Sequence, residues 1–126
     1  MKSVLIDTSV WVDHFRRVNQ GLVYLLGRDL VMIHPLIAGE LACGTLPNRA
    51  RVLVDLNRLQ PAQEATLKET LDFVESEKLF GIGCGLVDML LLASTKLTPQ
   101  TEIWTLDKRL SALAERFGVM HRPGTH

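Results

Sequence analysis

The alternation of short apolar runs, rich in β-branched residues, with longer segments of helical spacing most constrains the fold. Residues 4–6, 30–33 and 103–106 are the apolar runs, and each ends at a residue typical of a helix cap or a helix's first turn. Because two parallel strands need a crossover between them, strands that alternate with helices favour an α/β fold. We therefore expect a three-layer α/β/α sandwich around a central, mainly parallel β-sheet with right-handed crossovers.

Helices are predicted where apolar residues recur three and four positions apart. These segments are residues 10–15, 22–26, 36–43, 49–59, 62–79, 86–97 and 110–117. In segment 62–79 we expect Leu67, Leu71 and Val74 to face the core. Residues 118–120 are expected to form a last short strand.

Length and composition predict one domain over residues 1–126, because 47% of these 126 residues are hydrophobic and can form one sizeable core. No apolar run approaches the roughly 20 residues of a membrane span, and no export signal is expected. Cys43 and Cys84 lack CxxC spacing and lie in apolar stretches, which is typical of buried thiols in a reducing compartment. We expect a cytoplasmic protein without a membrane segment.

Two acidic residues, Asp7 and Asp107, directly follow predicted strands, and each precedes a predicted helix. In an open parallel sheet, ligands bind beyond the carboxyl ends of the strands, so both residues are candidates for a functional site. The alternative is that each only caps its helix, which is a common role of Asp.

Two further acids, Glu40 and Asp88, lie inside predicted helices. Glu40 is three and four residues from Ile37 and Leu36, which places it on the apolar stripe of its helix. Asp88 interrupts a helix that is apolar nearly all round, where an unpaired carboxylate costs several kcal/mol. No Lys or Arg stands one helical turn from either acid, so a local salt bridge cannot explain them.

A bound divalent cation explains both acids. Carboxylate oxygens, with no His or Cys at ligand spacing, select Mg²⁺ or Mn²⁺ over zinc. Such ions acidify water and stabilise charge on a scissile phosphate, so a phosphodiester is the expected substrate. The net charge of +0, from 14 basic and 14 acidic residues, does not by itself indicate nucleic-acid binding.

Four segments that contain these acids closely resemble the PIN-domain family, specifically the VapC-type toxins of bacterial toxin–antitoxin pairs. They are residues 6–13 (IDTSVWVD), 38–41 (AGEL), 83–93 (GCGLVDMLLLA) and 104–110 (WTLDKRL). The resemblance implies a metal-dependent ribonuclease with a PIN-like fold, a Mg²⁺ or Mn²⁺ site, frequent homodimers and inhibition by a small cognate antitoxin. By position, Asp7, Glu40, Asp88 and Asp107 match the family's acidic quartet, which implies that they are the catalytic, metal-holding residues.

Neighbouring polar residues are candidates for supporting roles. The hydroxyls of Thr8, Ser9 and Thr105 can orient water or a phosphate, with helix capping as the alternative. Four basic residues flank the expected cleft and are candidates to bind RNA phosphates. They are Arg16, Arg17, Lys108 and Arg109.

The resulting hypothesis is hydrolysis of RNA. The resemblance implies that the products carry 5′-phosphate and 3′-hydroxyl ends. One alternative is a receiver-like signalling domain, which needs a phosphoacceptor Asp at the end of a central strand, whereas the second strand here ends at His34-Pro35. Another is a catalytically silent binding module whose acids only dock a basic antitoxin tail. Metal-dependent RNA cleavage distinguishes the enzyme from the silent module.

Overall fold

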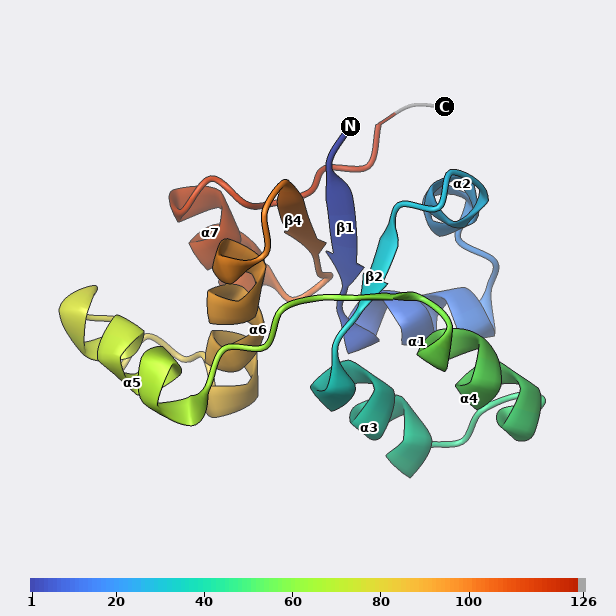
Figure 1. Ribbon diagram of the computed structural model, residues 1–126, viewed down its shortest axis with the longest axis horizontal. Helices are drawn as coiled ribbons and strands as arrows, with labels where there is room; N and C mark the ends of the chain where they lie inside the picture. Colours follow the sequence, from blue (N-terminus) through green and yellow to red (C-terminus); the bar gives the residue numbers. More distant parts are fainter. Residues whose placement is uncertain (125–126) are drawn as a thin grey trace.

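The sheet is built on short apolar strands whose carboxyl ends lie at one edge (Figure 1). The computed structural model describes residues 1–124, and its strands are β1 (Ser3–Ile6), β2 (Val31–Ile33), β3 (Gln60–Pro61) and β4 (Thr101–Trp104). Their order in the sheet is β3-β2-β1-β4, and every pairing is parallel. The parallel sheet between helices confirms the expected α/β fold.

The strand order reverses beside β1. From β1 the chain adds β2 and then β3 on one side, and it then crosses back to place β4 on the other side. Ile6 pairs with Trp104, so Asp7 and Thr105 leave the sheet at the same level. In open α/β sheets, this reversal point is where ligands bind beyond the strand ends.

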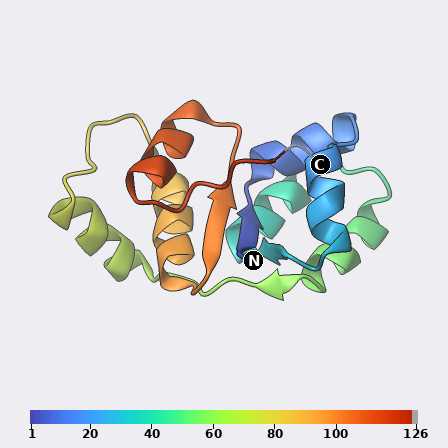
Figure 2. The same ribbon diagram turned by 90° about the horizontal axis from the view of Figure 1, so that it is seen from above.

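Seven helices connect and cover the strands within residues 1–124. They are α1 (Thr8–Arg16), α2 (Gln20–Gly27), α3 (Pro35–Cys43), α4 (Arg49–Asn57), α5 (Leu67–Ser76), α6 (Leu86–Leu97) and α7 (Lys108–Arg116). In both views α5, α6 and α7 lie together beyond β4, whereas α1 to α4 lie around β1 and β2 (Figures 1 and 2). None of these helices has the length and apolar character that a bilayer crossing requires.

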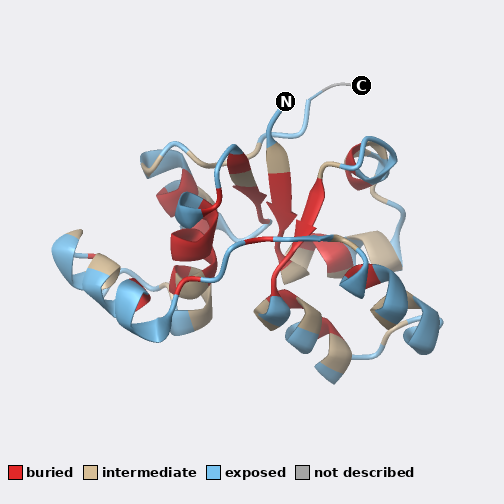
Figure 3. Cartoon of the chain, viewed as in Figure 1, coloured by how far each residue is buried: buried red, intermediate tan, exposed pale blue. Residues whose placement is uncertain are grey.

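The core lies between the strands and the helices, where Figure 3 shows buried residues in β1, β2 and β4 and in the middle of α6. Leu5, Ile103 and Leu91 are fully buried there. Ser94 of α6 is also fully buried, and its hydroxyl accepts a hydrogen bond from the Ala65 backbone at 3.0 Å. The polar group in this apolar helix is therefore satisfied, as burial requires.

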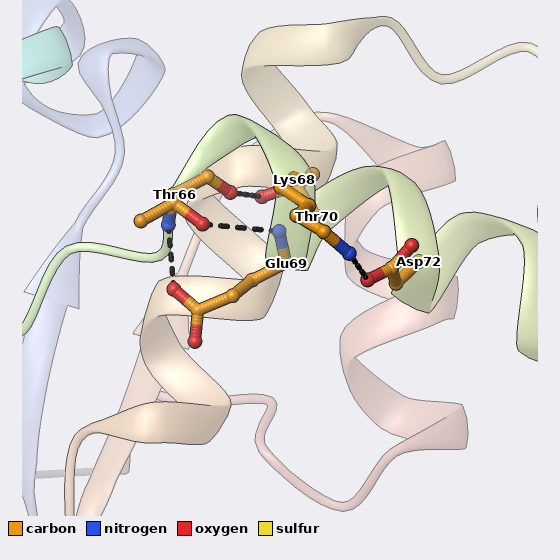
Figure 4. Close-up of polar contacts among 5 residues, drawn as sticks. All are labelled: Thr66, Lys68, Glu69, Thr70 and Asp72. Carbon is orange, nitrogen blue, oxygen red and sulfur yellow. Dashed lines mark hydrogen bonds and ion pairs between the residues drawn. The ribbon is translucent and has the colours of Figure 1, made fainter.

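Helix α5 begins later than the predicted start at residue 62. Thr66 and Glu69 form a capping box, in which each side chain accepts a hydrogen bond from the other residue's backbone N–H (Figure 4). Before it, the N–H groups of Ala62 and Ala65 donate to Ile33 and Ser94. Because these donors are used by distant partners, residues 62–65 stay outside the helix.

The expected inward face of α5 is also wrong for two residues. Leu67 and Leu71 are 53% and 48% exposed, whereas Thr70 is 0% exposed. The Thr70 hydroxyl donates to the Thr66 carbonyl at 2.9 Å, which satisfies it inside the core (Figure 4). Val74 is partly buried against the core, as predicted.

Strand limits differ from the predictions at three places. β3 was not expected, because its second residue is Pro61, which only an edge strand accommodates. β4 spans Thr101–Trp104, so it begins and ends two residues before the predicted strand 103–106. Instead of a strand over 118–120, Met120 alone bridges to Ile103. The single domain over 1–126 stays a prediction, and residues 125–126 lie outside the described residues.

Candidate active site

Asp7 occupies the N-cap position of α1, but its side chain makes no capping hydrogen bond. Its Oδ2 accepts hydrogen bonds from the Ser9 and Thr105 hydroxyls, each at 2.7 Å. The residue is only 8% exposed. The capping alternative is therefore wrong for Asp7, and its Oδ1 has no hydrogen-bond partner in the described part of the chain.

The same two hydroxyls connect the turn after β1 to the loop after β4. Ser9 Oγ accepts a hydrogen bond from the Leu106 backbone at 3.0 Å, and Thr105 Oγ1 accepts one from the Asp107 backbone at 3.0 Å. Each hydroxyl thus donates to Asp7 and accepts from the neighbouring loop. This network fixes the start of α7 relative to Asp7.

Asp107 is a true helix cap. Its Oδ1 accepts hydrogen bonds from the backbones of Arg109 and Leu110, both at 2.9 Å. The residue is exposed, and Oδ2 takes no part in the cap. The capping alternative therefore holds for one oxygen of Asp107 and leaves the other available to a ligand.

Glu40 is exposed on α3, contrary to the expectation that it lies on the apolar stripe. Ile37 and Leu41 form the buried face of this helix, which turns Glu40 away from the core. Its Oε1 accepts a hydrogen bond from the Thr8 hydroxyl at 2.7 Å. Thr8 thus joins the first turn of α1 to the carboxylate of α3.

Asp88 lies in the first turn of α6 and is partly buried. Burial raises the pKa of its carboxyl above the ordinary range, and the negative charges of Asp107, Asp7 and Glu40 raise it further. A hydrogen bond from the Gly85 backbone opposes these effects on the pKa. The three other acids of the predicted quartet are therefore close enough for Asp88 to experience their charge.

These carboxylates do not form a ready ligand shell. Among residues 1–124, no three His, Cys, Asp or Glu side chains are arranged to hold a metal ion. None of the ion pairs in this part of the chain involves a quartet acid. The four carboxylates repel one another when no counterion is present. Their oxygens are the hard ligands that Mg²⁺ and Mn²⁺ prefer, so the chemistry of these residues fits one of these ions.

A hollow of about 620 Å³ extends from Glu40 between α1 and α3. Its lining includes Thr8, Arg16 and the apolar side chains of Val12 and Phe15. Arg16 and Glu40 therefore line the same hollow.

The other predicted basic residues differ in their surroundings. Arg17, the C-cap that follows α1, and Lys108, the first residue of α7, are exposed. Arg109 is engaged with the chain itself, because its Nη1 donates to the Gly83 carbonyl oxygen at 3.2 Å.

No function was predicted for the glycine-rich loop 81–85, although its Gly-x-Gly-x-Gly pattern is visible in the sequence. Within it, burial raises the pKa of the Cys84 thiol, and the charges of Asp88 and Asp107 raise it further while Arg109 lowers it. Cys84 therefore lies among the charged groups of the site. Cys43 is exposed, so the expectation of two buried thiols is wrong for it.

Comparison with known proteins adds an independent finding. No family model matches the chain. Ribonuclease VapC32, from two strains of Mycobacterium tuberculosis, is 42% identical to it over 116 residues. The match spans 92% of this chain and 94% of that protein, so the likeness extends over almost the full length of both.

Proposed function

The chain belongs to the VapC family of PIN-domain ribonucleases, and on this premise we propose that Asp7, Glu40, Asp88 and Asp107 form its catalytic, cation-holding site. The family assignment makes it a ribonuclease and the toxin component of a type II toxin–antitoxin pair. The observation that carries the site is the hydrogen-bond network through which Ser9 and Thr105 join Asp7 to the turn that holds Asp107, and the charges of the other three acids also raise the pKa of Asp88. The repulsion among these negative charges supports a bound cation, and the turn that follows β1, where Asp7 lies, is at the strand-order reversal.

We propose Mg²⁺ or Mn²⁺ as that charge. The chemistry that such a bound ion supplies is acidification of water and stabilisation of negative charge on a phosphodiester. Asp7 Oδ1 and Asp107 Oδ2 are the oxygens that their hydrogen-bond networks leave available. Asp88 and Glu40 complete the donor set from α6 and α3.

The chain's own residues prepare the site in two ways. Ser9 and Thr105 hold Asp7 through one oxygen, so the other keeps a fixed direction. Thr8 restrains Glu40 by its hydrogen bond to Oε1. These restraints lower the conformational entropy that the carboxylates lose when they gather around a ligand.

RNA approaches along the hollow beside Glu40 in this proposal. Arg16 lines the hollow and contacts a phosphate of the substrate, and Arg17 and Lys108 add positive charge at its margins. Hydrolysis leaves 5′-phosphate and 3′-hydroxyl ends. A cognate antitoxin inhibits the enzyme, which acts in the cytoplasm and forms a homodimer.

Cleavage of RNA by the purified protein tests the proposal. Activity is expected with Mg²⁺ or Mn²⁺ and should disappear in EDTA. It should fall at least about 100-fold in Asp7→Asn and in Asp107→Asn. Asp72→Asn on α5 is the matched control, because Asp72 is exposed and, among residues 1–124, forms an ion pair with Lys68 alone. Cleavage that survives EDTA, or equal losses in the control, contradicts the site. A folded, metal-binding protein that cleaves no RNA identifies the silent binding module instead.

A further inference from the structure

Arg109 of α7 is seated on the backbone of Gly83. Besides the 3.2 Å hydrogen bond from Nη1 to the Gly83 carbonyl oxygen, the guanidinium occupies the space that a side chain would need. A Cβ at Gly83 would lie 2.7 Å from Nη1 and 3.0 Å from Cζ of Arg109. Gly83 also has a φ of +91°, a conformation that favours glycine. Only glycine at position 83 therefore leaves room for the guanidinium in this position.

The contact joins two helix starts that carry acids of the site. On one side, the Arg109 backbone donates to the cap Asp107, two residues earlier. On the other side, Gly83 lies two residues before Gly85, the N-cap of α6, whose backbone hydrogen-bonds to Asp88. A single side chain thus connects the turn that holds Asp107 to the turn that holds Asp88.

The charge of Arg109 is also present at this junction. The Cys84 thiol, next to Gly83, experiences the charges of Asp88, Asp107 and Arg109 together. No carboxylate among residues 1–124 forms an ion pair with Arg109, and its guanidinium instead binds a backbone carbonyl. Its geometry is therefore suited to holding the loop and not to neutralising one acid.

We propose that Arg109 is a positioning residue, which sets the placement of Asp88 relative to Asp107 by clamping Gly83, instead of the RNA-phosphate contact that the sequence predicted. The inference rests on the proposed function, because it concerns the same acids. It assigns loop 81–85 a role in the reaction without contact to substrate. Loss of the clamp lets two like charges separate, which weakens their shared hold on a cation.

Arg109→Gln tests the clamp. Its affinity for Mn²⁺, measured by calorimetry without RNA, is expected to fall about 10- to 100-fold, as when other outer partners of metal ligands are removed. In RNA cleavage assays of Arg109→Gln, kcat is expected to fall, while KM and the salt dependence of RNA binding stay close to the wild-type values. Arg109→Lys keeps the charge but lacks the planar guanidinium, so it is expected to show the same loss of Mn²⁺ affinity.

Gly83→Ala approaches the same contact from the other side, because its Cβ displaces the guanidinium. Gly81→Ala is the matched control: Gly81 also has a positive φ, +72°, but a Cβ there would meet nothing within 4 Å. Gly83→Ala is expected to lower Mn²⁺ affinity while Gly81→Ala does not. In the double variant with Arg109→Gln, Gly83→Ala is expected to add little further loss.

Two results overturn the clamp. One is a raised KM with a salt slope reduced by about 1 in Arg109→Gln, at unchanged kcat and Mn²⁺ affinity, which identifies a phosphate contact. The other is equal Mn²⁺ affinity in the two glycine variants. Since Mn²⁺ binding is measured without RNA, a wild-type protein that binds Mn²⁺ but cleaves no RNA refutes the proposed function and leaves the clamp testable.

Discussion

At Asp88, burial and neighbouring negative charges both raise the pKa of the carboxyl. Its place in the first turn of α6 favours an acid through the helix dipole, and the Gly85 backbone donates to it. The pKa of its carboxyl is nevertheless raised, by burial first and then by three neighbouring acids. The surroundings of Asp88 therefore disfavour its charged form, which is typical of a functional acid.

Asp88→Asn is expected to separate function from stability. The change keeps the side chain's shape and removes one of four mutually repelling charges, so the free energy of unfolding in EDTA should hold or rise. Mn²⁺ affinity and RNA cleavage should fall by orders of magnitude. Thermal melts in EDTA beside cleavage assays measure both. A structural Asp88 paired with a cation would show the opposite, a loss of about 3 kcal/mol or more without metal.

Thr105 is the residue whose hydroxyl joins two of the acids, since it donates to Asp7 and accepts from the Asp107 backbone. Thr105→Val keeps the shape but removes both hydrogen bonds in a buried place, so we expect a loss of about 1–3 kcal/mol in the free energy of unfolding. Thr105→Ser keeps the hydroxyl and should lose less. Urea unfolding measures both, and a larger loss in Thr105→Ser, which lacks the methyl group, than in Thr105→Val would show that packing of the methyl group matters more than the two hydrogen bonds.

Among the elements, the sequence predicted those that carry strong local signals. Short β-branched runs placed β1 and β2, and apolar periodicity placed α6 with its bounds unchanged. The start of α5 was predicted too early, because the N–H groups before it bond to Ile33 and Ser94, which are distant in sequence. β3 has two residues and no local signal at all.

The same distinction holds within the site. The order and type of the four acids were visible in the sequence, because a motif is a local property. The cap hydrogen bonds of Asp107 were also predictable, but those of Asp7 were not, since Ser9 and Thr105, which both donate to it, are 96 residues apart. The seat of Arg109 on Gly83 spans 26 residues and depends on a backbone conformation that no pattern specifies.

His34 caps α3 and links it to α6, so the stability of these elements should depend on pH. Its Nδ1 accepts from the Leu36 backbone, so Nε2 carries the proton of the neutral ring and donates to Ser94 Oγ at 3.1 Å. Burial lowers the pKa of His34 below 6.5, and the charge of Glu64 opposes this effect. Below about pH 6.5 the unfolded chain therefore binds more protons at His34 than the folded chain does.

The free energy of unfolding is accordingly expected to fall as the pH decreases from about 6.5 towards the lower folded-state pKa of His34. His34→Asn keeps an acceptor at the cap and removes the titrating ring, so the fall should become shallower. Urea unfolding between pH 5 and 7.5 measures it, with His14→Asn as the control for loss of a histidine. Wild-type and His34→Asn curves that fall in parallel would contradict the assignment.

At the scale of the whole molecule, a neutral chain brings four like charges within reach of one another. Its 14 acids balance 14 basic residues, yet the charges of Asp107, Asp7 and Glu40 all act on Asp88. Neutralising those four charges leaves a net charge of +4 on the chain. Cation binding at the site should thus convert a neutral protein into one with a mild bias towards polyanions such as RNA.

The same concentration of charge predicts how an antitoxin inhibits the enzyme. A guanidinium can meet two carboxylates at once through its planar fork, so we expect the antitoxin to place an Arg among the quartet, where the cation otherwise binds. Antitoxin binding and Mn²⁺ binding should then compete. When antitoxin is titrated into the protein at rising Mn²⁺, the apparent Kd of the antitoxin should increase by the factor 1 + [Mn²⁺]/Kd, where Kd is that of Mn²⁺ at the cation site. Asp88→Asn supplies the control, because a variant that binds Mn²⁺ weakly should show little of this dependence. An antitoxin affinity that stays constant as Mn²⁺ saturates the wild-type protein would place the inhibitor elsewhere on the surface.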